Sequence, residues 1–283
     1  MSTTLVTAWT AARNRLRDAG VETPAFDARL LIEAAASVTR TDILTDPYRE
    51  LSPAQLSAIE AFVARRELRE PVSHILGKKA FWTFELTVTP AVLAPRPETE
   101  LLVETALSFF EKDAPAEILD LGIGSGAIAI ALLHERRRAR VTGADKSADA
   151  LAIARFNAVA QLVADRLTLI ESDWAEAIAG ETRFDVIVSN PPYVRAGAID
   201  LLEPEVARFE PRLALDGGRD GLDAYRIVMP AIARLLKPDG RWAVEIGQGQ
   251  AEAVWAHADK AGLRPEGVRH DLAGVDRVVY GRK

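Results

Sequence analysis

The first 70 residues place apolar side chains at a helical period. Leu5, Trp9, Ala12 and Leu16 follow one another at intervals of about three to four residues, so they share one helical face. Residues 52–55 (SPAQ) have the form of a capping box with proline at the first helical position. These patterns predict a small helical bundle at the start of the chain.

The pattern changes between residues 74 and 95. The stretch from Phe81 to Val88 is aromatic and β-branched, and Pro90 and Pro95 follow it. This composition favours strands, and the prolines mark turns beside them. We expect a short β-hairpin that links two domains, followed by a helix from about Pro97.

From residue 117 onward, apolar runs of strand length alternate with helical segments. Such alternation is typical of a doubly wound, mostly parallel sheet, so the fold class is α/β. We expect a helical domain over residues 1–73, the hairpin linker over 74–95 and the α/β domain over 96–283. The expected strands cover residues 118–121, 140–145, 167–170, 184–189, 241–246, 263–270 and 277–281, and the expected helices cover residues 127–135, 148–161, 223–236 and 250–261.

Composition narrows the classes of protein. The chain has 283 residues, no cysteine, and four histidines without metal-ligand spacing, so we expect neither a thiol nucleophile nor a bound metal. No apolar run has the length of a membrane span, and no secretory signal is visible, so we expect a cytoplasmic protein without membrane contact. The net charge is −6, and the first 80 residues are close to neutral. A duplex-binding protein usually carries a basic footprint, so we expect no direct nucleic-acid partner.

A glycine loop follows the first strand of the expected sheet. Asp120 precedes it, and the loop itself reads Gly122-Ile123-Gly124-Ser125-Gly126. Glycines allow a ligand to approach the backbone, and the next helix offers free N–H groups. Asp145, at the end of the second strand, can hold ribose hydroxyls of either NAD or S-adenosylmethionine. Asp120 would repel a pyrophosphate but suits the ammonium group of a methionine moiety.

Two further segments end strands of the same sheet. Asp173 and Trp174 follow the third strand, where an acid can accept from an adenine amino group and an indole can cover the ring; a helix cap with a buried aromatic is an equally good interpretation. Asn190-Pro191-Pro192-Tyr193 follows the fourth strand. We expect these segments at one edge of the sheet, because ligands in such sheets lie at the carboxyl ends of strands.

The Asn190–Tyr193 tetrad has a chemical logic. An amide or exocyclic amino nitrogen is a poor nucleophile because its lone pair is delocalised. The Asn190 side-chain oxygen and the Pro191 carbonyl can each accept one of its hydrogens, which aims the lone pair and stabilises the developing positive charge. Pro191 and Pro192 fix the backbone, and Tyr193 offers a flat surface for stacking. The tetrad predicts methyl transfer to a planar amino nitrogen.

These motifs resemble the class I S-adenosylmethionine-dependent methyltransferases, with their Rossmann-like fold. More closely, the chain is similar to the protein-(glutamine-N5) methyltransferases of peptide-chain release factors (the PrmC/HemK family). The similarity extends over almost the whole length, and the segments that discriminate this family from adenine methyltransferases are the linker and the proline-rich stretch. They cover residues 74–77, 81–82, 95–100, 208–211 and 271–277.

The resemblance implies a specific reaction. The substrate would be the glutamine of the Gly-Gly-Gln loop in bacterial release factors, gripped by the helical domain, and the chain would act as a monomer. Residues 122–126, Asp145, Trp174 and Asn190 would bind S-adenosylmethionine, and residues 190–193 would hold the glutamine. Ile123 departs from the family, which commonly has threonine there.

Three alternatives remain open. An adenine-N6 methyltransferase acting on DNA or RNA presents the same NH2 chemistry, but the acidic balance and the lack of a target-recognition domain argue against it. An NAD dehydrogenase fits the glycine loop but leaves the tetrad without a role. A non-enzymatic adaptor with a retired methyltransferase fold is the weakest, because both motifs are intact.

Overall fold

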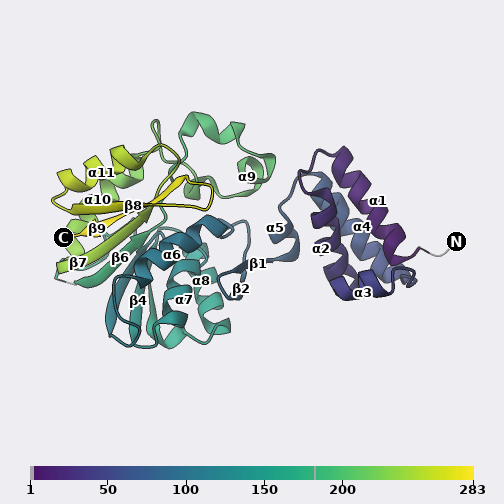
Figure 1. Cartoon of the computed structure of the whole chain (residues 1–283), viewed down its shortest axis with the longest axis horizontal. Coiled ribbons are helices and arrows are strands. Elements are labelled where there is room, and N and C mark those ends of the chain that lie inside the picture. Colours follow the sequence, from purple (N-terminus) through teal and green to yellow (C-terminus); the bar gives the residue numbers. More distant parts are fainter. Residues whose placement is uncertain (1–2, 182) are drawn as a thin grey trace. The chain divides into compact units, whose positions relative to one another are not determined.

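The computed structural model describes residues 3–181 and 183–283 (Figure 1). It divides into two compact units. One unit extends to Gly77 and also includes Glu203–Phe209. The other comprises Lys78–Leu202 and Glu210–Lys283.

The first unit is helical, as its apolar periodicity predicts. Its core contains Leu5, Ala12 and Leu16, and Trp9 packs at the edge of that core. The capping box predicted at residues 52–55 is present, because Ser52 Oγ accepts from the Gln55 N–H at 3.2 Å and Gln55 Oε1 accepts from the Ser52 N–H at 2.9 Å. The helices are α1 Leu5–Asp18, α2 Pro24–Ala36, α3 Arg40–Thr45, α4 Pro53–Glu67 and α5 Val72–Leu76.

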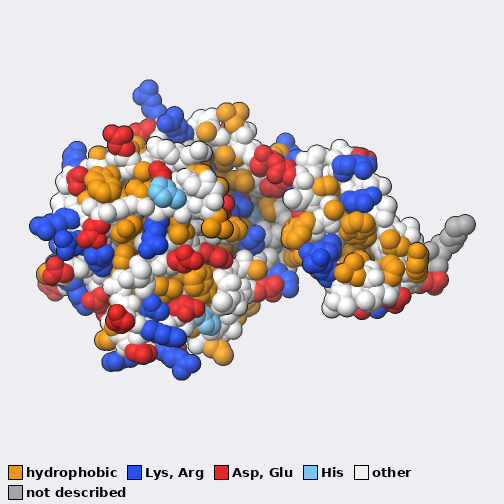
Figure 2. All heavy atoms as spheres, viewed as in Figure 1, with side chains coloured by type: hydrophobic (Ala, Val, Ile, Leu, Met, Phe, Trp, Pro, Cys, Tyr) orange, Lys and Arg blue, Asp and Glu red, His pale blue; other side chains and the backbone are white. Residues whose placement is uncertain are grey.

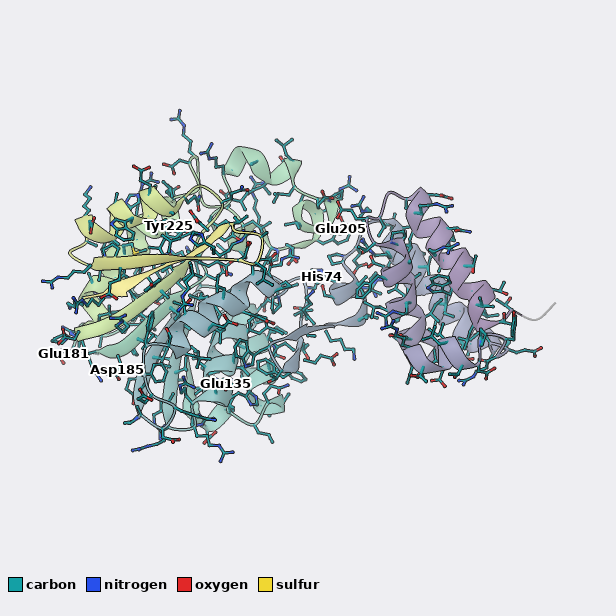
Figure 3. The ribbon with its side chains drawn as sticks, viewed as in Figure 1. His74, Glu135, Glu181, Asp185, Glu205 and Tyr225 are labelled. Carbon is teal, nitrogen blue, oxygen red and sulfur yellow. The ribbon has the colours of Figure 1, made fainter. Side chains whose placement is uncertain are left out.

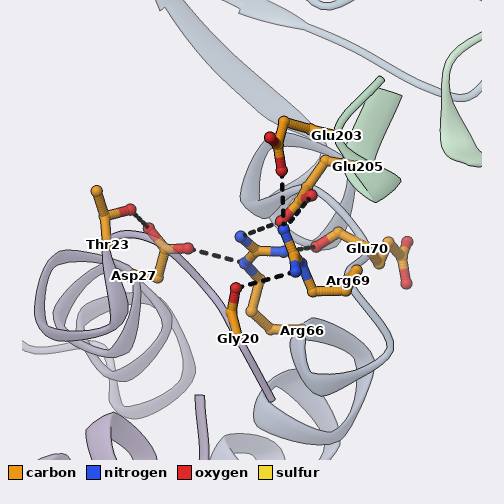
Figure 4. A network of polar contacts seen from close by, with 8 residues as sticks. All are labelled: Gly20, Thr23, Asp27, Arg66, Arg69, Glu70, Glu203 and Glu205. Carbon is orange, nitrogen blue, oxygen red and sulfur yellow. Dashed lines mark hydrogen bonds and ion pairs between the residues drawn. The ribbon is translucent and has the colours of Figure 1, made fainter. Parts of the chain in front are cut away.

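A short helix from the second half of the sequence completes this unit. Helix α9, Pro204–Phe209, lies against α4 through ion pairs (Figure 4). Arg66 is buried and donates to Asp27 and to Glu205, both at 2.8 Å. Arg69 donates to the same Glu205 carboxylate at 2.7 and 2.8 Å. Charge pairing between residues more than 130 positions apart therefore holds α9 in place.

The second unit begins with a hairpin, β1 Lys78–Phe81 and β2 Phe84–Thr87, whose strands pair antiparallel. A seven-stranded sheet follows in the order β5-β4-β3-β6-β7-β9-β8, parallel from β5 to β7 and antiparallel at β9 and β8. The doubly wound α/β prediction is confirmed. The strands are β3 Ala116–Leu121, β4 Ala139–Asp145, β5 Leu167–Glu171, β6 Phe184–Ser189, β7 Leu236–Glu245, β8 Arg264–His270 and β9 Asp276–Arg282.

Helices cover both faces of this sheet (Figure 1). One apolar core lies between the sheet and α6 Glu100–Leu107, α7 Ala127–Glu135 and α8 Ala148–Ala160. The other lies between the sheet and α10 Asp223–Leu235 and α11 Ala251–Lys260. Because its strands are buried on both faces, the sheet needs near-continuous apolar sequences such as Val186-Ile187-Val188.

Two local features differ from the sequence prediction. Leu236 was predicted as the last residue of a helix, but its backbone is extended and it pairs with Phe184 as the first residue of β7. Helix α9 was not predicted, because six residues give no periodic pattern and its charged partners lie in a distant part of the chain.

The Arg66 network gives a stability prediction. Arg66→Met should lower the free energy of unfolding by about 3–5 kcal/mol, because it leaves the buried Asp27 carboxylate without its cation. Urea denaturation followed by circular dichroism measures this difference. Arg17→Met is the matched control: Arg17 pairs with Asp18 on the surface, so its loss should change stability by less than about 0.5 kcal/mol. Equal effects of the two variants would contradict the role assigned to Arg66.

Candidate active site

The glycine loop folds back onto the neighbouring strand. The N–H groups of Gly122 and Ile123 both donate to the Ala144 carbonyl, at 2.8 and 3.0 Å. Gly122, Gly124 and Gly126 all have positive φ, between 55° and 85°, a region that favours glycine. The loop therefore needs its three glycines for its backbone path, and α7 begins directly after Gly126.

Packing gives two glycines a further role. A Cβ on Gly126 would lie 3.1 Å from the Ile130 side chain and 3.4 Å from Ala154, so this glycine lets α7 approach α8. A Cβ on Gly143 would lie 2.1 Å from Cδ1 of Ile123. The isoleucine that replaces the family's usual threonine thus fills the space above Gly143, a position that the sequence analysis did not single out.

Asp145 supports the loop from the end of β4. Its two carboxylate oxygens each accept one backbone N–H at 2.9 Å, one from Gly124 and one from Ser147. A carboxylate has about four lone-pair positions, so each oxygen can accept a further hydrogen bond. Asp145 therefore stabilises the loop backbone and can still accept hydrogen bonds from a ligand.

The residues after β5 lie beside the loop. The Trp174 ring lies 3.8 Å from the position of a Cβ on Gly122, so the indole flanks the first glycine. Asp173 forms an ion pair with Lys146, and both side chains are partly exposed. The side chain that caps this turn is that of the preceding residue, because Ser172 Oγ accepts from the Ala177 N–H at 3.0 Å. Adenine recognition by Asp173 stays a prediction.

Asp120 lies beneath the loop and is fully buried. Burial, together with the charge of Asp145, raises the pKa of Asp120 to about 7. Neither of its oxygens has a hydrogen-bond partner among the described residues. Burying an ionised carboxylate this deeply destabilises the folded state unless a cation or a hydrogen-bond donor lies beside it. Above about pH 7 the carboxyl is ionised, and its charge then lies next to the start of the glycine loop.

The tetrad follows β6, the strand that pairs with β3. Leu121 and Ser189 are in register at the ends of these strands, and Ser189 Oγ donates to the Leu121 carbonyl at 2.6 Å. The glycine loop and the tetrad therefore start from adjacent positions. Asn190 Nδ2 donates to Thr99 Oγ1 at 3.2 Å. No hydrogen bond among the described residues uses Asn190 Oδ1, which remains as an acceptor.

The backbone of the tetrad is fixed from outside. Gln250 donates through Nε2 to the Tyr193 carbonyl at 3.0 Å and to the Gly221 carbonyl at 3.1 Å. A Cβ on Gly217 would lie 2.9 Å from the Pro192 carbonyl, and one on Gly221 would lie 2.6 Å from the Tyr193 carbonyl. Sequence reasoning missed these three residues, because only their distance from the tetrad in the fold connects them to it.

A buried acid lies behind the tetrad. Tyr193 donates its hydroxyl to Glu245 Oε1 at 3.3 Å. Tyr225 on α10 (Figure 3) donates to the backbone carbonyl of Glu245 at 2.8 Å. Burial raises the pKa of Glu245 to about 7, while the hydrogen bond from Tyr193 and the charge of Arg277 oppose the rise. Glu245 was also missed, since it ends an ordinary apolar strand.

These elements enclose a cavity of about 560 Å³ at the carboxyl ends of β3, β4, β5 and β6. This volume suits a cofactor-sized ligand. Most of the predicted site residues line it: Gly122, Ile123, Gly124, Ser125, Asp145, Asp173, Trp174, Asn190 and Pro192. The lining does not include four other predicted residues: Asp120, Gly126, Pro191 and Tyr193. Segments 91–99 and 211–216, to which the sequence analysis gave no definite role, contribute further apolar lining.

The buried Asp120 generates a prediction about stability and pH. In the unfolded chain this carboxyl ionises near its ordinary value of 3.8, whereas in the folded chain it keeps its proton up to about pH 7. The folded state therefore binds more protons across that window, and its stability falls as the pH rises through it. Asp120→Asn should remove this loss and be more stable than the unchanged protein at pH 8 by about 2–4 kcal/mol.

Urea denaturation of the ligand-free protein at pH 5 and pH 8 measures this effect. Glu117→Gln on the same strand is the control, because its side chain is exposed. An Asp120→Asn variant that is less stable at pH 8 would show that the ionised carboxylate has a compensating partner.

Two further observations concern metal binding and membrane-spanning helices. Within the described residues, no group of three or more His, Asp or Glu side chains is placed to bind a metal ion. No helix among them is long and apolar enough to cross a membrane.

Comparison with known proteins identifies the family. A family model described as the PrmC N-terminal domain matches residues 7–77, and a methyltransferase small domain model matches residues 97–208. Among solved structures, a methyltransferase from Pyrococcus furiosus has a TM-score of 0.53 at 17% identity, covering 80% of this chain and 98% of that one. A 16S rRNA methyltransferase from T. thermophilus, in complex with AdoMet and guanosine, has a TM-score of 0.52 at 20% identity, covering 73% of this chain and 49% of that one. These two structures share the fold.

Curated relatives are much closer in sequence. The release factor glutamine methyltransferase of Caulobacter vibrioides is 52% identical over 283 residues, which is 100% of this chain and 98% of the relative. That of Rhodospirillum rubrum is 46% identical over 269 residues, or 95% of this chain and 82% of the relative. With full-length identity at this level and both parts of the chain matched, the protein belongs to the release factor glutamine methyltransferase family.

Proposed function

We propose that the protein transfers a methyl group from S-adenosylmethionine to the side-chain amide nitrogen of the glutamine in the Gly-Gly-Gln motif of peptide-chain release factors. The observation that carries the proposal is Asn190, which lies on the cavity wall beside the glycine loop with Oδ1 unused among the described residues. The names of the full-length relatives support the same substrate.

The residues of the cavity fit S-adenosylmethionine. The glycine loop leaves its backbone open to a ligand, because a Cβ on Gly124 would meet no atom within 4 Å. Asp145 retains acceptor positions for the ribose hydroxyls, and Trp174 offers an aromatic face at the same wall. Above about pH 7, where Asp120 is ionised, its charge favours the ammonium group of the methionine moiety. When bound, the cofactor supplies an electrophilic methyl group.

The tetrad orients the side-chain nitrogen of the glutamine for methyl transfer. Asn190 Oδ1 and the Pro191 carbonyl accept the two amide hydrogens, which orients the nitrogen toward the methyl donor and stabilises its developing positive charge. Gln250, Gly217 and Gly221 hold the tetrad backbone, so the acceptors need no reorganisation during the reaction. The Tyr193 ring packs against the apolar core and its hydroxyl donates to Glu245, so its stacking role stays a prediction.

The second candidate is adenine N6, which also presents a planar NH2. On the face shown in Figure 2, lysine and arginine lie among aspartate and glutamate rather than in a continuous basic surface. Such mixing gives little attraction for a nucleic-acid backbone. The charge distribution therefore favours the protein substrate.

We also propose that residues 1–73 bind the release factor, that residues 74–95 link them to a transfer domain over 96–283, and that the protein acts as a cytoplasmic monomer. The helical unit exposes four large apolar side chains: Phe26, Leu44, Tyr48 and Leu68. Exposed apolar groups of this size often contact partner proteins. Because α9 also belongs to this unit, point variants test it better than a deletion of the N-terminal residues.

The reaction itself is tested by mass spectrometry. Incubation with S-adenosylmethionine and a purified release factor should add one methyl group to the glutamine of its Gly-Gly-Gln motif. Asn190→Ala should keep the fold and slow the transfer by about 100- to 1,000-fold, because one stabilising acceptor is lost. Methylation of adenine in DNA or RNA, with none on the release factor, would overturn the proposal in favour of the second candidate.

The helical unit is tested by serine substitution of its exposed apolar residues. At least one of the variants Phe26→Ser, Leu44→Ser, Tyr48→Ser and Leu68→Ser should raise KM for the intact release factor by about tenfold, since one buried apolar side chain contributes about 1.5–3 kcal/mol. None should change kcat for a short glutamine peptide. Leu162→Ser, an equally exposed residue of the second unit, is the control. Unchanged KM in all four variants would contradict the proposed role.

A further inference from the structure

A buried carboxamide on α8 joins the glycine loop to the hairpin. The residue is Asn157, which is 1% exposed. Its Oδ1 accepts from the Thr87 N–H at 2.8 Å, and its Nδ2 donates to the carbonyls of Thr87 and Ser125, both at 2.9 Å. Both protons of the Asn157 NH2 group are therefore used, and the three hydrogen bonds connect two segments that are distant in sequence.

Thr87 fixes the orientation of this carboxamide. It directs both its N–H and its carbonyl at Asn157, and this pair of groups is the complement of a carboxamide. In the opposite orientation, the Asn157 NH2 group would face the Thr87 N–H, and the Asn157 oxygen would face the Thr87 carbonyl. Both hydrogen bonds would then be lost. The hairpin therefore directs the remaining N–H of Asn157 at the Ser125 carbonyl.

The hairpin presents the free edge of β2 to α8. One helical turn beyond Asn157, Gln161 Nε2 donates to the Glu85 carbonyl at 2.9 Å. Residues two apart in a strand are separated by about 6.8 Å, and residues four apart in a helix by about 6 Å along its axis. Because these spacings match, the two side chains meet alternate residues of the same strand edge. Of the two, only Asn157 also bonds to the glycine loop among the described residues.

The glycine loop needs this support at the peptide between Ser125 and Gly126. Ser125 is 4% exposed, and a buried carbonyl without a partner destabilises the fold. On the other side of the same peptide, the Gly126 N–H donates to the Ile123 carbonyl at 2.9 Å. Gly126 can adopt φ of either sign, so its own preferences do not prevent this peptide from rotating. The bond to Asn157 holds the carbonyl toward α8 and fixes the peptide.

The segment after the hairpin belongs to the same arrangement. Val88 and Val92 are buried, and they pack with Ala150 of α8 in a small apolar cluster. Residues 91–93 line the cavity of the candidate active site. The hairpin and one part of the cavity wall are therefore held on α8 within a few residues of chain.

We propose that Asn157 is a positioning residue that couples docking of the hairpin linker on α8 to the affinity of the glycine loop for the methyl donor. The hairpin is docked when Thr87 is hydrogen-bonded to Asn157, which then holds the Ser125 carbonyl. Without docking, the carboxamide is free to turn, and the loop loses this bond. Coupling of this kind is reciprocal, so donor binding also stabilises the docked hairpin. The inference goes beyond the proposed function, because it concerns the methyl donor and holds for any methyl acceptor.

The first test measures the Kd of S-adenosylhomocysteine by calorimetry, without a methyl acceptor. Asn157→Ala should raise this Kd by about tenfold, because the Ser125 carbonyl loses its partner and the loop is no longer held in its binding conformation. Circular dichroism of the same sample establishes that the variant is folded at the temperature of the measurement.

A matched control lies on the same helix. Gln161→Ala removes a hydrogen bond between α8 and the hairpin but leaves the bond from Asn157 to Ser125 in place. Its Kd for S-adenosylhomocysteine should change by less than about twofold. Equal increases in Asn157→Ala and Gln161→Ala would overturn the role of Asn157, because loosening of the hairpin alone would then explain both.

The second test measures the reciprocal effect by hydrogen–deuterium exchange of the hairpin, residues 78–87. Saturating S-adenosylhomocysteine should slow this exchange in the unchanged protein by up to about tenfold, the same factor as the change in Kd. In Asn157→Ala the ligand should have no effect on the hairpin. A merely structural role would speed the exchange in this variant but preserve the effect of the ligand.

A second variant covers the case in which Asn157→Ala folds poorly. Asn157→Asp keeps the shape of the side chain and the acceptor for the Thr87 N–H, but an ionised carboxylate has no proton for the Ser125 carbonyl. It should raise the Kd at pH 8 by at least as much as Asn157→Ala. The exchange measurement on the unchanged protein needs no variant at all.

The outcomes separate this inference from the proposed function. An unchanged Kd in both Asn157 variants, or no effect of the ligand on the hairpin of the unchanged protein, would overturn the inference. Neither result depends on the methyl acceptor. Failure of the unchanged protein to methylate a release factor would overturn the proposed function and leave these binding measurements valid.

Discussion

The site depends on the parallel pairing of β3 with β6. Asp120 lies opposite Val188 and Leu121 opposite Ser189, so both strands end at the same level of the sheet. The glycine loop and the tetrad, nearly 70 residues apart in sequence, therefore emerge side by side, and a hydrogen bond from Ser189 Oγ to the Leu121 carbonyl reinforces the pairing. A shift of one residue in this register would turn the side chains of β6 to the other face of the sheet and move Asn190 away from the cavity wall.

Two buried acids near the site lower the stability of the fold. Asp120 lies below the glycine loop and Glu245 below the tetrad, and burial raises the pKa of each to about 7. Neither contributes to packing as an apolar residue would. A buried acid with a raised pKa is the arrangement expected where stability is given up for function.

The sequence predicts those parts of the structure that are specified by neighbouring residues in the chain. Strands, helices, the glycine loop and the tetrad each occupy a continuous segment with a recognisable pattern, so their positions follow from periodicity and strand order. Thr99, Glu245 and Gln250 could not be found in this way, because each is ordinary in its own segment. Their importance comes from hydrogen bonds to residues more than 50 positions away. Gly143 was missed for a similar reason, since only the Ile123 side chain explains it.

Helix α9 shows how the chain connects the two units. The chain leaves the second unit after Leu202, contributes Glu203–Phe209 to the first unit and re-enters the second at Glu210. The point of return is fixed, because Glu210 accepts from the Ala94 N–H and from Arg96, both at 3.2 Å. The segment that follows, residues 211–216, lines the cavity. Ion pairs at Arg66 and Arg69 thus restrain one end of a short segment whose other end leads directly into the wall of the active site.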